Sequence, residues 1–238
     1  MTNVGLVRQQ NQDCYDCFGL PGEGAFAVVC DGMGGPFGGE VASALSRAVI
    51  RDVIDGGYKK EMDGDAVVQL LRVAVEAANA AVFERSKSDD EHSGMGTTVV
   101  AALVRGGYAY IANVGDSRAY IFTSQGLSRI THDHSVVQEM LDGGSITENE
   151  ARTHPQKNII TRALGTQDNI NIDFFKTPVE VGNRILLCSD GLTNMVTDAD
   201  ISFETGHTDS SELVLAALLR KTLDAGATDN VTAVLIDV

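Results

Sequence analysis

The stretch at residues 25–39, AFAVVCDGMGGPFGG, constrains this chain most, because an apolar run ends abruptly in Asp31 and closely spaced glycines follow. The six apolar or small residues before Asp31 predict a buried strand that delivers one carboxylate to a loop. Glycine lacks Cβ, so a glycine-rich loop can adopt positive φ angles and come within contact distance of an ion or a phosphate. Taken alone, Asp-Gly after an apolar run is also a common hairpin signal.

The same arrangement occurs again in the second half of the chain. Residues 185–191, ILLCSDG, form another apolar run that ends in Asp190 and a glycine. Asp116 in NVGDSRAY and Asp229 in GATDNVTAV lie at comparable junctions beside β-type segments. Together with Asp31, these residues favour one convergent acidic site over four unrelated turns.

Length and charge narrow the class of protein. At 238 residues the chain can form one large or two small domains. No linker or low-complexity run divides it, so we expect a single domain over residues 1–238. The net charge of −15 opposes binding to nucleic acid. An anionic substrate is compatible with this charge where bound cations invert the local field.

Two further features bear on location and on cysteine chemistry. The first residues do not resemble a signal peptide and the longest apolar runs are too short to span a bilayer, so we expect a cytoplasmic protein away from membranes. Cys14 and Cys17 form a C-x-x-C pair, but no second pair follows at zinc-site spacing. We therefore expect free thiols.

The apolar periodicity predicts an α+β sandwich and not a doubly wound α/β fold, because the predicted strands mostly follow one another and the helices come in pairs. The predicted strands are residues 14–18, 25–30, 97–104, 108–114, 119–123, 127–130, 170–177, 184–189 and 231–238. The predicted helices are a segment from residue 40 to the Gly56-Gly57 pair and residues 65–88, 135–141, 147–152, 198–205 and 210–225. The polar connection at residues 153–165 is typical of a lid or binding loop.

Clustered carboxylates indicate a site for Mg²⁺ or Mn²⁺, since both ions prefer oxygen ligands. Two like charges about 4 Å apart repel by up to ~4 kcal/mol at an effective dielectric of 20, so two cations are the natural remedy. Two such ions about 3.5 to 4 Å apart can clamp a phosphoryl group for in-line attack. The sequence has no G-K-[ST] phosphate loop, H-E-x-x-H, G-x-S-x-G or thiol-phosphatase pattern that would support a competing chemistry.

Over essentially its whole length the chain resembles the metal-dependent serine/threonine protein phosphatases of type 2C, the PPM family, and especially the bacterial ones. The shared motifs occur in order: G-L-V-R-Q-Q-N-Q-D from Gly5, D-G-M-G-G from Asp31, G-T-T from Gly96, N-V-G-D-S-R-A-Y from Asn113, T-H-D-H-S from Thr131, T-R-A-L-G from Thr161, C-S-D-G-L from Cys188 and D-N-V-T from Asp229. Eight ordered motifs form a specific signal, although each one alone is weak.

The resemblance implies a four-layer α/β/β/α sandwich, in which two central, mainly antiparallel sheets are flanked by helix pairs. It also implies a metal site in a cleft at one end, bordered by a flap subdomain at about residues 135–157. The implied activity is hydrolysis of phosphoserine and phosphothreonine in proteins by a hydroxide that bridges two Mn²⁺ or Mg²⁺ ions. The alternative is a phosphoprotein-binding regulatory module of the same fold with little turnover.

Roles for individual residues follow from the same resemblance. Asp31 is expected to bridge two metal ions, with the backbone carbonyl of Gly32 on one of them. Asp190 and Asp229 are expected to complete the other. Asp116 matches, together with Asp190, a weaker third metal position of the family.

The remaining expected site residues act on water and substrate. The resemblance implies that Asp13 hydrogen-bonds metal-bound water and that Arg8 holds the substrate phosphate, for which a guanidinium offers a rigid pair of donors. Three positions depart from common family patterns: Met33 and Pro36 stand where many relatives have histidine, and Gln12 replaces a frequent glutamate. The general acid is therefore unassigned.

The leaving group could take its proton from metal-bound water or from a histidine such as His134 or His154. Each of these histidines is more often a structural or surface residue. The resemblance further implies phosphorylated proteins as partners, with a serine/threonine kinase supplying the substrates. We expect a monomer.

Overall fold

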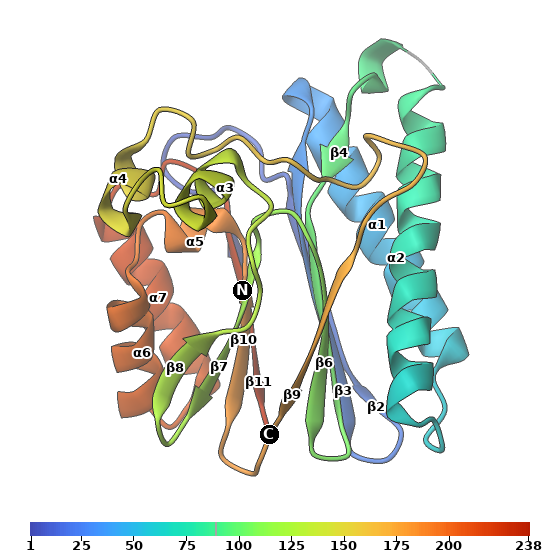
Figure 1. Ribbon diagram of the computed structural model, residues 1–238, viewed down its shortest axis with the longest axis vertical. Helices are drawn as coiled ribbons and strands as arrows, with labels where there is room; N and C mark the ends of the chain where they lie inside the picture. Colours follow the sequence, from blue (N-terminus) through green and yellow to red (C-terminus); the bar gives the residue numbers. More distant parts are fainter. Residues whose placement is uncertain (89) are drawn as a thin grey trace.

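The computed structural model describes residues 1–88 and 90–238, apart from the side chains of residues 36 and 37. Two antiparallel sheets face each other in the middle of the molecule, and a pair of long helices covers the outer face of each (Figure 1). The prediction of two central antiparallel sheets flanked by helix pairs is therefore confirmed.

Strand order places the ends of distant segments side by side. One sheet has the order β1 (Thr2–Asn3), β11 (Val231–Asp237), β10 (Arg184–Cys188), β7 (Arg118–Thr123) and β8 (Gly126–Arg129). The other has the order β2 (Asp13–Leu20), β3 (Gly24–Met33), β5 (Val99–Arg105), β6 (Tyr108–Val114) and β9 (Asp173–Pro178), with β4 (Gly96–Thr97) paired to the end of β3. Every named pair is antiparallel, and short turns join β2 to β3, β5 to β6 and β7 to β8.

Helices complete the outer layers. α1 (Gly35–Gly57) and α2 (Gly64–Ser86) cover one sheet, while α6 (Asp198–His207) and α7 (Ser211–Asp224) cover the other (Figure 1). The short helices α3 (Val136–Asp142) and α4 (Glu148–Thr153) lie within residues 135–157, for which a flap subdomain is predicted. α5 (Asp190–Thr193) begins two residues after the end of β10. A 3₁₀ turn, η1 (Asp90–His92), follows α2, and residue 89 before it lies outside the described part of the chain.

The apolar runs fold as strands that are buried on both faces. In β10, Ile185 and Leu187 belong to the core between the two sheets, whereas Leu186 and Cys188 belong to the core under α6 and α7. Successive side chains of a strand point to opposite faces, so a continuous apolar run satisfies both cores at once. This two-sided burial fixes where the strand ends, and with it the position of Asp190, two residues further on.

α2 is the one helix in the described part of the chain that is long and apolar enough, by length and composition alone, to cross a membrane. The prediction that no such segment exists considered only uninterrupted apolar runs and is therefore incomplete. In the structure Leu71, Ala74, Ala78 and Val82 of α2 are fully buried within the protein. These contacts already use the apolar face of the helix.

The glycine-rich stretch is shorter as a loop than the sequence predicts. β3 runs on to Met33, and α1 begins at Gly35, so that one residue separates them; the chain turns through positive φ angles of 118° at Gly34 and 77° at Gly35. The reason is close backbone packing: a Cβ on Gly32 would lie 2.0 Å from the carbonyl oxygen of Gly39. The glycines at both positions thus let the first turn of the helix lie directly on the end of the strand.

This packing makes Gly32 intolerant of a side chain. We expect Gly32→Ala to destabilise the protein by about 1 to 3 kcal/mol through overpacking, with a loss in melting temperature of about 2 to 4 °C per kcal/mol. Thermal unfolding in EDTA measures this without a contribution from metal binding. Gly56→Ala is the control, because a Cβ at that helical position meets nothing within 4 Å. An equal fall in both variants would contradict the packing argument.

Candidate metal centre

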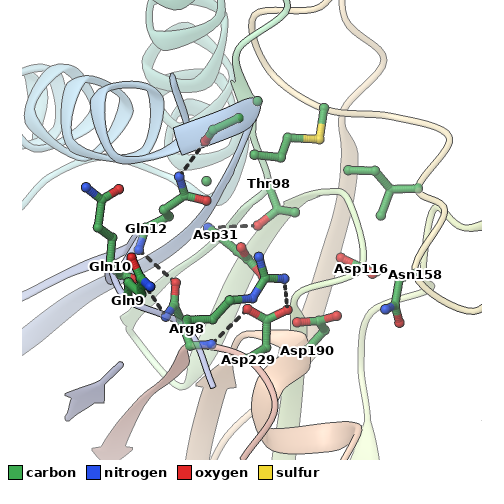
Figure 2. A pocket seen from close by; sticks show the side chains of 16 residues that line it. Arg8, Gln9, Gln10, Gln12, Asp31, Thr98, Asp116, Asn158, Asp190 and Asp229 are labelled. Atoms are coloured by element: carbon green, nitrogen blue, oxygen red, sulfur yellow. Dashed lines mark hydrogen bonds and ion pairs between the residues drawn. The ribbon is translucent and has the colours of Figure 1, made fainter. Parts of the chain in front are cut away.

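A cavity of about 620 Å³ opens at one end of the sandwich, between the ends of the two sheets. Figure 2 shows four carboxylates around it, contributed by four separate segments of the chain. The lining includes Arg8, Gln12, Asp31, Gly32, Met33, Thr98, Asp116, Asn158, Ile160, Asp190, Asp229 and Asn230. The four carboxylates predicted from the sequence therefore share one pocket.

Asp31 is held by its backbone at the end of β3. Its N–H donates to Thr98 Oγ1 at 3.1 Å, and its carbonyl accepts from the Thr98 N–H and the Thr97 hydroxyl, both at 2.8 Å. The next amide, that of Gly32, donates to the carbonyl of Gln12 at 3.1 Å. With the main chain bonded on both sides, the Asp31 side chain projects into the cavity from a rigid support (Figure 2).

The other carboxylates come from the first residues after, or the last residue before, a strand. Asp190 follows β10 by two positions and accepts a hydrogen bond from Asn194 Nδ2 at 2.9 Å. Asp229 precedes β11 by two positions, and its Oδ1 accepts from the Asn230 N–H at 2.9 Å. Asp116 follows β6 and is 9% exposed. Each of these carboxylates lies within two residues of a buried strand, which is why an apolar run next to an aspartate predicts all of them in the sequence.

Burial and mutual repulsion raise the pKa values of these acids. The pKa of Asp31 lies well above its ordinary value, first because the group is buried and then because other carboxylates surround it, with Asp13 the largest contributor and Asp190 next. Burial also raises the pKa of Asp116 and of Asp190. Since a raised carboxyl pKa means that the charged form is disfavoured, the cluster lacks the positive charge that would balance it.

Asp13 lies behind this cluster and is not part of the cavity lining. It is 5% exposed, faces Asp31 across the β2–β3 pair, and accepts a hydrogen bond from Ser189 Oγ at 2.8 Å. Burial raises the pKa of Asp13 to about 6. Its other oxygen, Oδ1, is buried and has no hydrogen-bond partner among the described residues. Such an orphaned acceptor is costly unless a further donor, such as an ordered water, meets it.

Arg8 lies at the rim of the cavity, as the sequence predicts, but it already has a partner. Its Nη2 donates to Asp229 Oδ2 at 2.7 Å, and the two side chains are 52% and 30% exposed. At this exposure an ion pair contributes little to stability. The Arg8–Asp229 ion pair instead holds the guanidinium beside the acidic cluster (Figure 2).

Comparison with known proteins identifies the family. A family model described as protein phosphatase 2C matches residues 7–235. The chain belongs to the protein phosphatase 2C family. The serine/threonine phosphatase stp of Listeria welshimeri is 34% identical over 99% of this chain and 93% of its own length. The resemblance to type 2C phosphatases is thus confirmed, as is the enzyme class, a protein-serine/threonine phosphatase.

Solved structures of this family have the same fold. The serine/threonine phosphatase Stp1 from Staphylococcus aureus has a TM-score of 0.94 and 35% identity, covering 100% of this chain and 93% of that one. The catalytic domain of the phosphatase PstP in complex with two manganese ions has a TM-score of 0.86 and 32% identity, covering 100% of this chain and 95% of that one. The fold prediction is confirmed by this agreement.

The donor chemistry of this type 2C phosphatase fits Mn²⁺ or Mg²⁺. Carboxylates, one backbone carbonyl and water are the ligands these ions prefer, and the raised pKa values show a site short of positive charge. In the described residues no three His, Cys, Asp or Glu side chains are already gathered closely enough to hold an ion. The carboxylates share the lining of one pocket, and their roles as ligands stay predictions.

Neither histidine considered as a general acid reaches the cavity. His134 is 4% exposed and both of its ring nitrogens have protein partners. His154 caps the end of α4, where its Nδ1 accepts the Gln156 N–H at 3.2 Å. Of the two positions where many relatives have histidine, Met33 lines the cavity, and the side chain of Pro36 lies outside the described part of the structure. This phosphatase thus brings no histidine from its described residues to the lining.

Asn158 and Ile160 are lining residues that the sequence analysis missed. They come from the segment after α4, which was predicted only as a polar connection with lid character. That segment pairs back onto the start of the flap through the Ser135–Ile160 bridge. A contact of this kind depends on the return path of the chain, for which the local sequence carries no signal.

The repulsion within the cluster gives a test of its convergence. We expect Asp31→Asn to raise the melting temperature in EDTA, because it removes the charge at the centre of the buried acids. The same variant loses most stabilisation by Mn²⁺, which in the wild type is about 2.7 kcal/mol at ~100 times the Kd, or about 2 to 4 °C per kcal/mol.

Thermal unfolding with EDTA and with Mn²⁺ measures both effects. Asp52→Asn, at an exposed position of α1, is the matched control. A variant that is less stable than wild type in EDTA, yet equally stabilised by Mn²⁺, would show that Asp31 is a turn residue and no ligand.

Proposed function

We propose that this type 2C phosphatase hydrolyses phosphoserine and phosphothreonine in proteins with the help of two divalent cations, Mn²⁺ or Mg²⁺. The observation that carries the proposal is the set of four carboxylates from four segments that share one cavity with an arginine at its rim. An acidic pocket of this kind cannot hold a phosphate dianion unless cations first reverse its charge. Metal binding and phosphate binding therefore belong to one site.

The chain offers a distinct role for each acid. Asp31 would bridge two ions with the Gly32 carbonyl on one of them, and Asp190 and Asp229 would complete the other. Asp116 lies beside Asp190 in the same lining and would hold a third ion with it. When bound, such ions activate water as a nucleophile at neutral pH and neutralise charge on the phosphoryl group.

Two further side chains act on water and substrate. Asp13 keeps one buried oxygen without a partner among the described residues, which suits it to accept a hydrogen bond from a metal-bound water. Arg8 reaches the cavity from the rim, and its guanidinium can hold two phosphate oxygens at once. Because Asp229 accepts a hydrogen bond from only one guanidinium nitrogen, the remaining donors stay available for a substrate.

The surroundings of the cavity support a protein as substrate. A second cavity, of about 950 Å³, lies beneath α3 and α4 and shares Asp116 and Asp190 with the first. A polypeptide could place its phosphorylated side chain in the first cavity and adjacent residues in the second. We further propose that residues 135–157 form a flap subdomain beside the site. The phosphoproteins would be products of a serine/threonine kinase, and the protein would act in the cytoplasm as a monomer.

The regulatory module with little turnover is the weaker candidate. The absence of a histidine from the described lining of the cavity is compatible with it. Retention of four costly acids around one pocket argues for the enzyme, because a module that only binds phosphoproteins gains nothing from buried, uncompensated carboxylates.

The activity itself is tested with two substrates, p-nitrophenyl phosphate and a phosphothreonine peptide. We expect hydrolysis of both with Mn²⁺, no hydrolysis in EDTA, and a loss of at least about 100-fold in Asp31→Ala, since the bridging ligand is removed. Phosphate release measures the rate. Stoichiometric peptide binding without metal-dependent release above the Asp31→Ala level would favour the regulatory module instead.

Arg8 gives a prediction that separates binding from chemistry. Because a hydrogen bond to a charged group contributes about 1.5 to 3 kcal/mol, we expect Arg8→Ala to raise KM for p-nitrophenyl phosphate roughly 10- to 100-fold while kcat changes little. Arg220→Ala, on the exposed side of α7, is the control. A tenfold or larger fall in kcat at unchanged KM would refute the assignment of Arg8 to the phosphate.

A further inference from the structure

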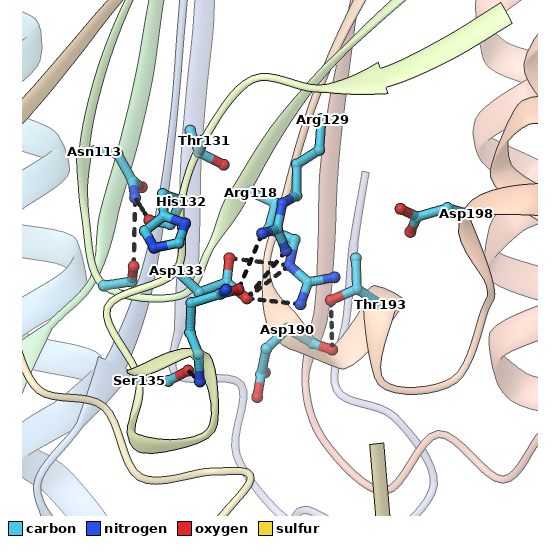
Figure 3. Close-up of polar contacts among 12 residues, drawn as sticks. Asn113, Arg118, Arg129, Thr131, His132, Asp133, Ser135, Asp190, Thr193 and Asp198 are labelled. Atoms are coloured by element: carbon cyan, nitrogen blue, oxygen red, sulfur yellow. Dashed lines mark hydrogen bonds and ion pairs between the residues drawn. The ribbon is translucent and has the colours of Figure 1, made fainter. Parts of the chain in front are cut away.

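His134 makes two hydrogen bonds to the turn that carries Asp116. The Gly115 N–H donates to His134 Nδ1 at 3.0 Å, and the Gly115 carbonyl accepts from the His134 N–H, also at 3.0 Å. Asn113 Nδ2 adds contacts to the carbonyls of Gly115 and His132, at 3.3 and 3.2 Å (Figure 3). Both polar backbone groups of the residue before Asp116 are thus fixed by the segment that leads into the flap.

The ring of His134 is held in this orientation from its other side. Its Nε2 lies 3.2 Å from Asp173 Oδ2 at the start of β9. Arg162 Nη1 donates to Asp173 Oδ1 at 2.9 Å and lies 3.1 Å from the same Nε2. Since Nδ1 accepts the Gly115 N–H, a neutral ring carries its proton on Nε2 and can donate it to Asp173. Burial lowers the pKa of His134, in agreement with a neutral ring.

The backbone of His134 reaches the flap as well. Its carbonyl accepts the Thr161 N–H at 2.8 Å, and the next residue, Ser135, forms an isolated bridge with Ile160. One buried imidazole thus lies where three parts of the structure meet: the turn after β6, the start of the flap and its return. The ring itself lies outside the cavity lining, so it acts through other residues and not on the substrate.

We propose that His134 is a positioning residue, which fixes the Gly115–Asp116 turn through its Nδ1 so that the Asp116 carboxylate keeps its place at the rim of the metal centre. The functional consequence rests on the proposed function, since Asp116 matters there as a ligand. Without the Nδ1 acceptor, the Gly115 amide is a buried donor with no partner, and the turn has to move to satisfy it.

Substitution of His134 by asparagine or by glutamine tests the Nδ1 contact and the Nε2 contact separately. In His134→Asn the side-chain oxygen can take the place of Nδ1 and still accept the Gly115 N–H. In His134→Gln the amide group lies near the position of Nε2, so it keeps contact with Asp173 and loses the Gly115 acceptor. His132→Asn is the control, because the His132 side chain is 46% exposed and binds Asp142 at the surface.

The first readout is the hydrogen exchange of the Gly115 amide, measured by NMR in EDTA. We expect His134→Gln to accelerate this exchange at least about tenfold relative to wild type, while His134→Asn and His132→Asn leave it within about threefold. Equal acceleration in both His134 variants, or acceleration in His134→Asn alone, would overturn the role of Nδ1. This arm needs no enzymatic activity.

The second readout is the Mn²⁺ concentration that gives half-maximal hydrolysis of p-nitrophenyl phosphate. We expect it to rise at least about tenfold in His134→Gln and to be restored to near the wild-type value in His134→Asn. Faster exchange with an unchanged Mn²⁺ requirement would make His134 a purely structural residue and overturn its positioning role. A wild type without Mn²⁺-dependent hydrolysis would instead contradict the proposed function. The exchange result would then show only that His134 holds the Gly115 backbone, with no effect on catalysis.

Discussion

Mutual repulsion among buried carboxylates is the constraint on which the rest of this structure depends. Asp31 is surrounded by the charges of Asp13, Asp190, Asp116 and Asp229, and burial adds to the cost of ionising it. A fold can hold such a cluster only if each acid is anchored through its backbone, since the side chains repel one another. The two-layer arrangement of sheets supplies this anchoring, because long buried strands end at the same place and cannot shift without disrupting their cores.

The two-sided burial of the strands links the core to the site. In β10, alternate residues fill the core between the sheets and the core under α6 and α7, which fixes both the register and the last residue of the strand. A slip of one position would exchange the two faces and move Asp190 away from the pocket. Close backbone packing of Gly32 on Gly39 likewise fixes the end of β3 and the position of Asp31. The packing that stabilises the strands therefore also sets the positions of the carboxylates.

Local patterns were sufficient to predict the four carboxylates, because an apolar run followed by Asp-Gly or a similar turn reports a strand end directly. The resemblance to type 2C phosphatases then supplied the expected arrangement of two antiparallel sheets. Long-range packing was not predictable in the same way. The Arg8–Asp229 pair spans 221 positions, and the ring of His134 is held by Asp173 at the start of β9. Each of these features is decided by a partner that lies far away in the sequence.

Anomalous diffraction from crystals grown with Mn²⁺ can show whether the four acids converge on shared divalent cations. We expect two manganese peaks about 3.5 to 4 Å apart in the cavity between the sheets, with the Asp31 carboxylate in contact with both and with Asp190 and Asp229 in contact with one of them. A cavity without manganese at saturating Mn²⁺, or ions bound there while Asp31 contacts neither, would contradict it.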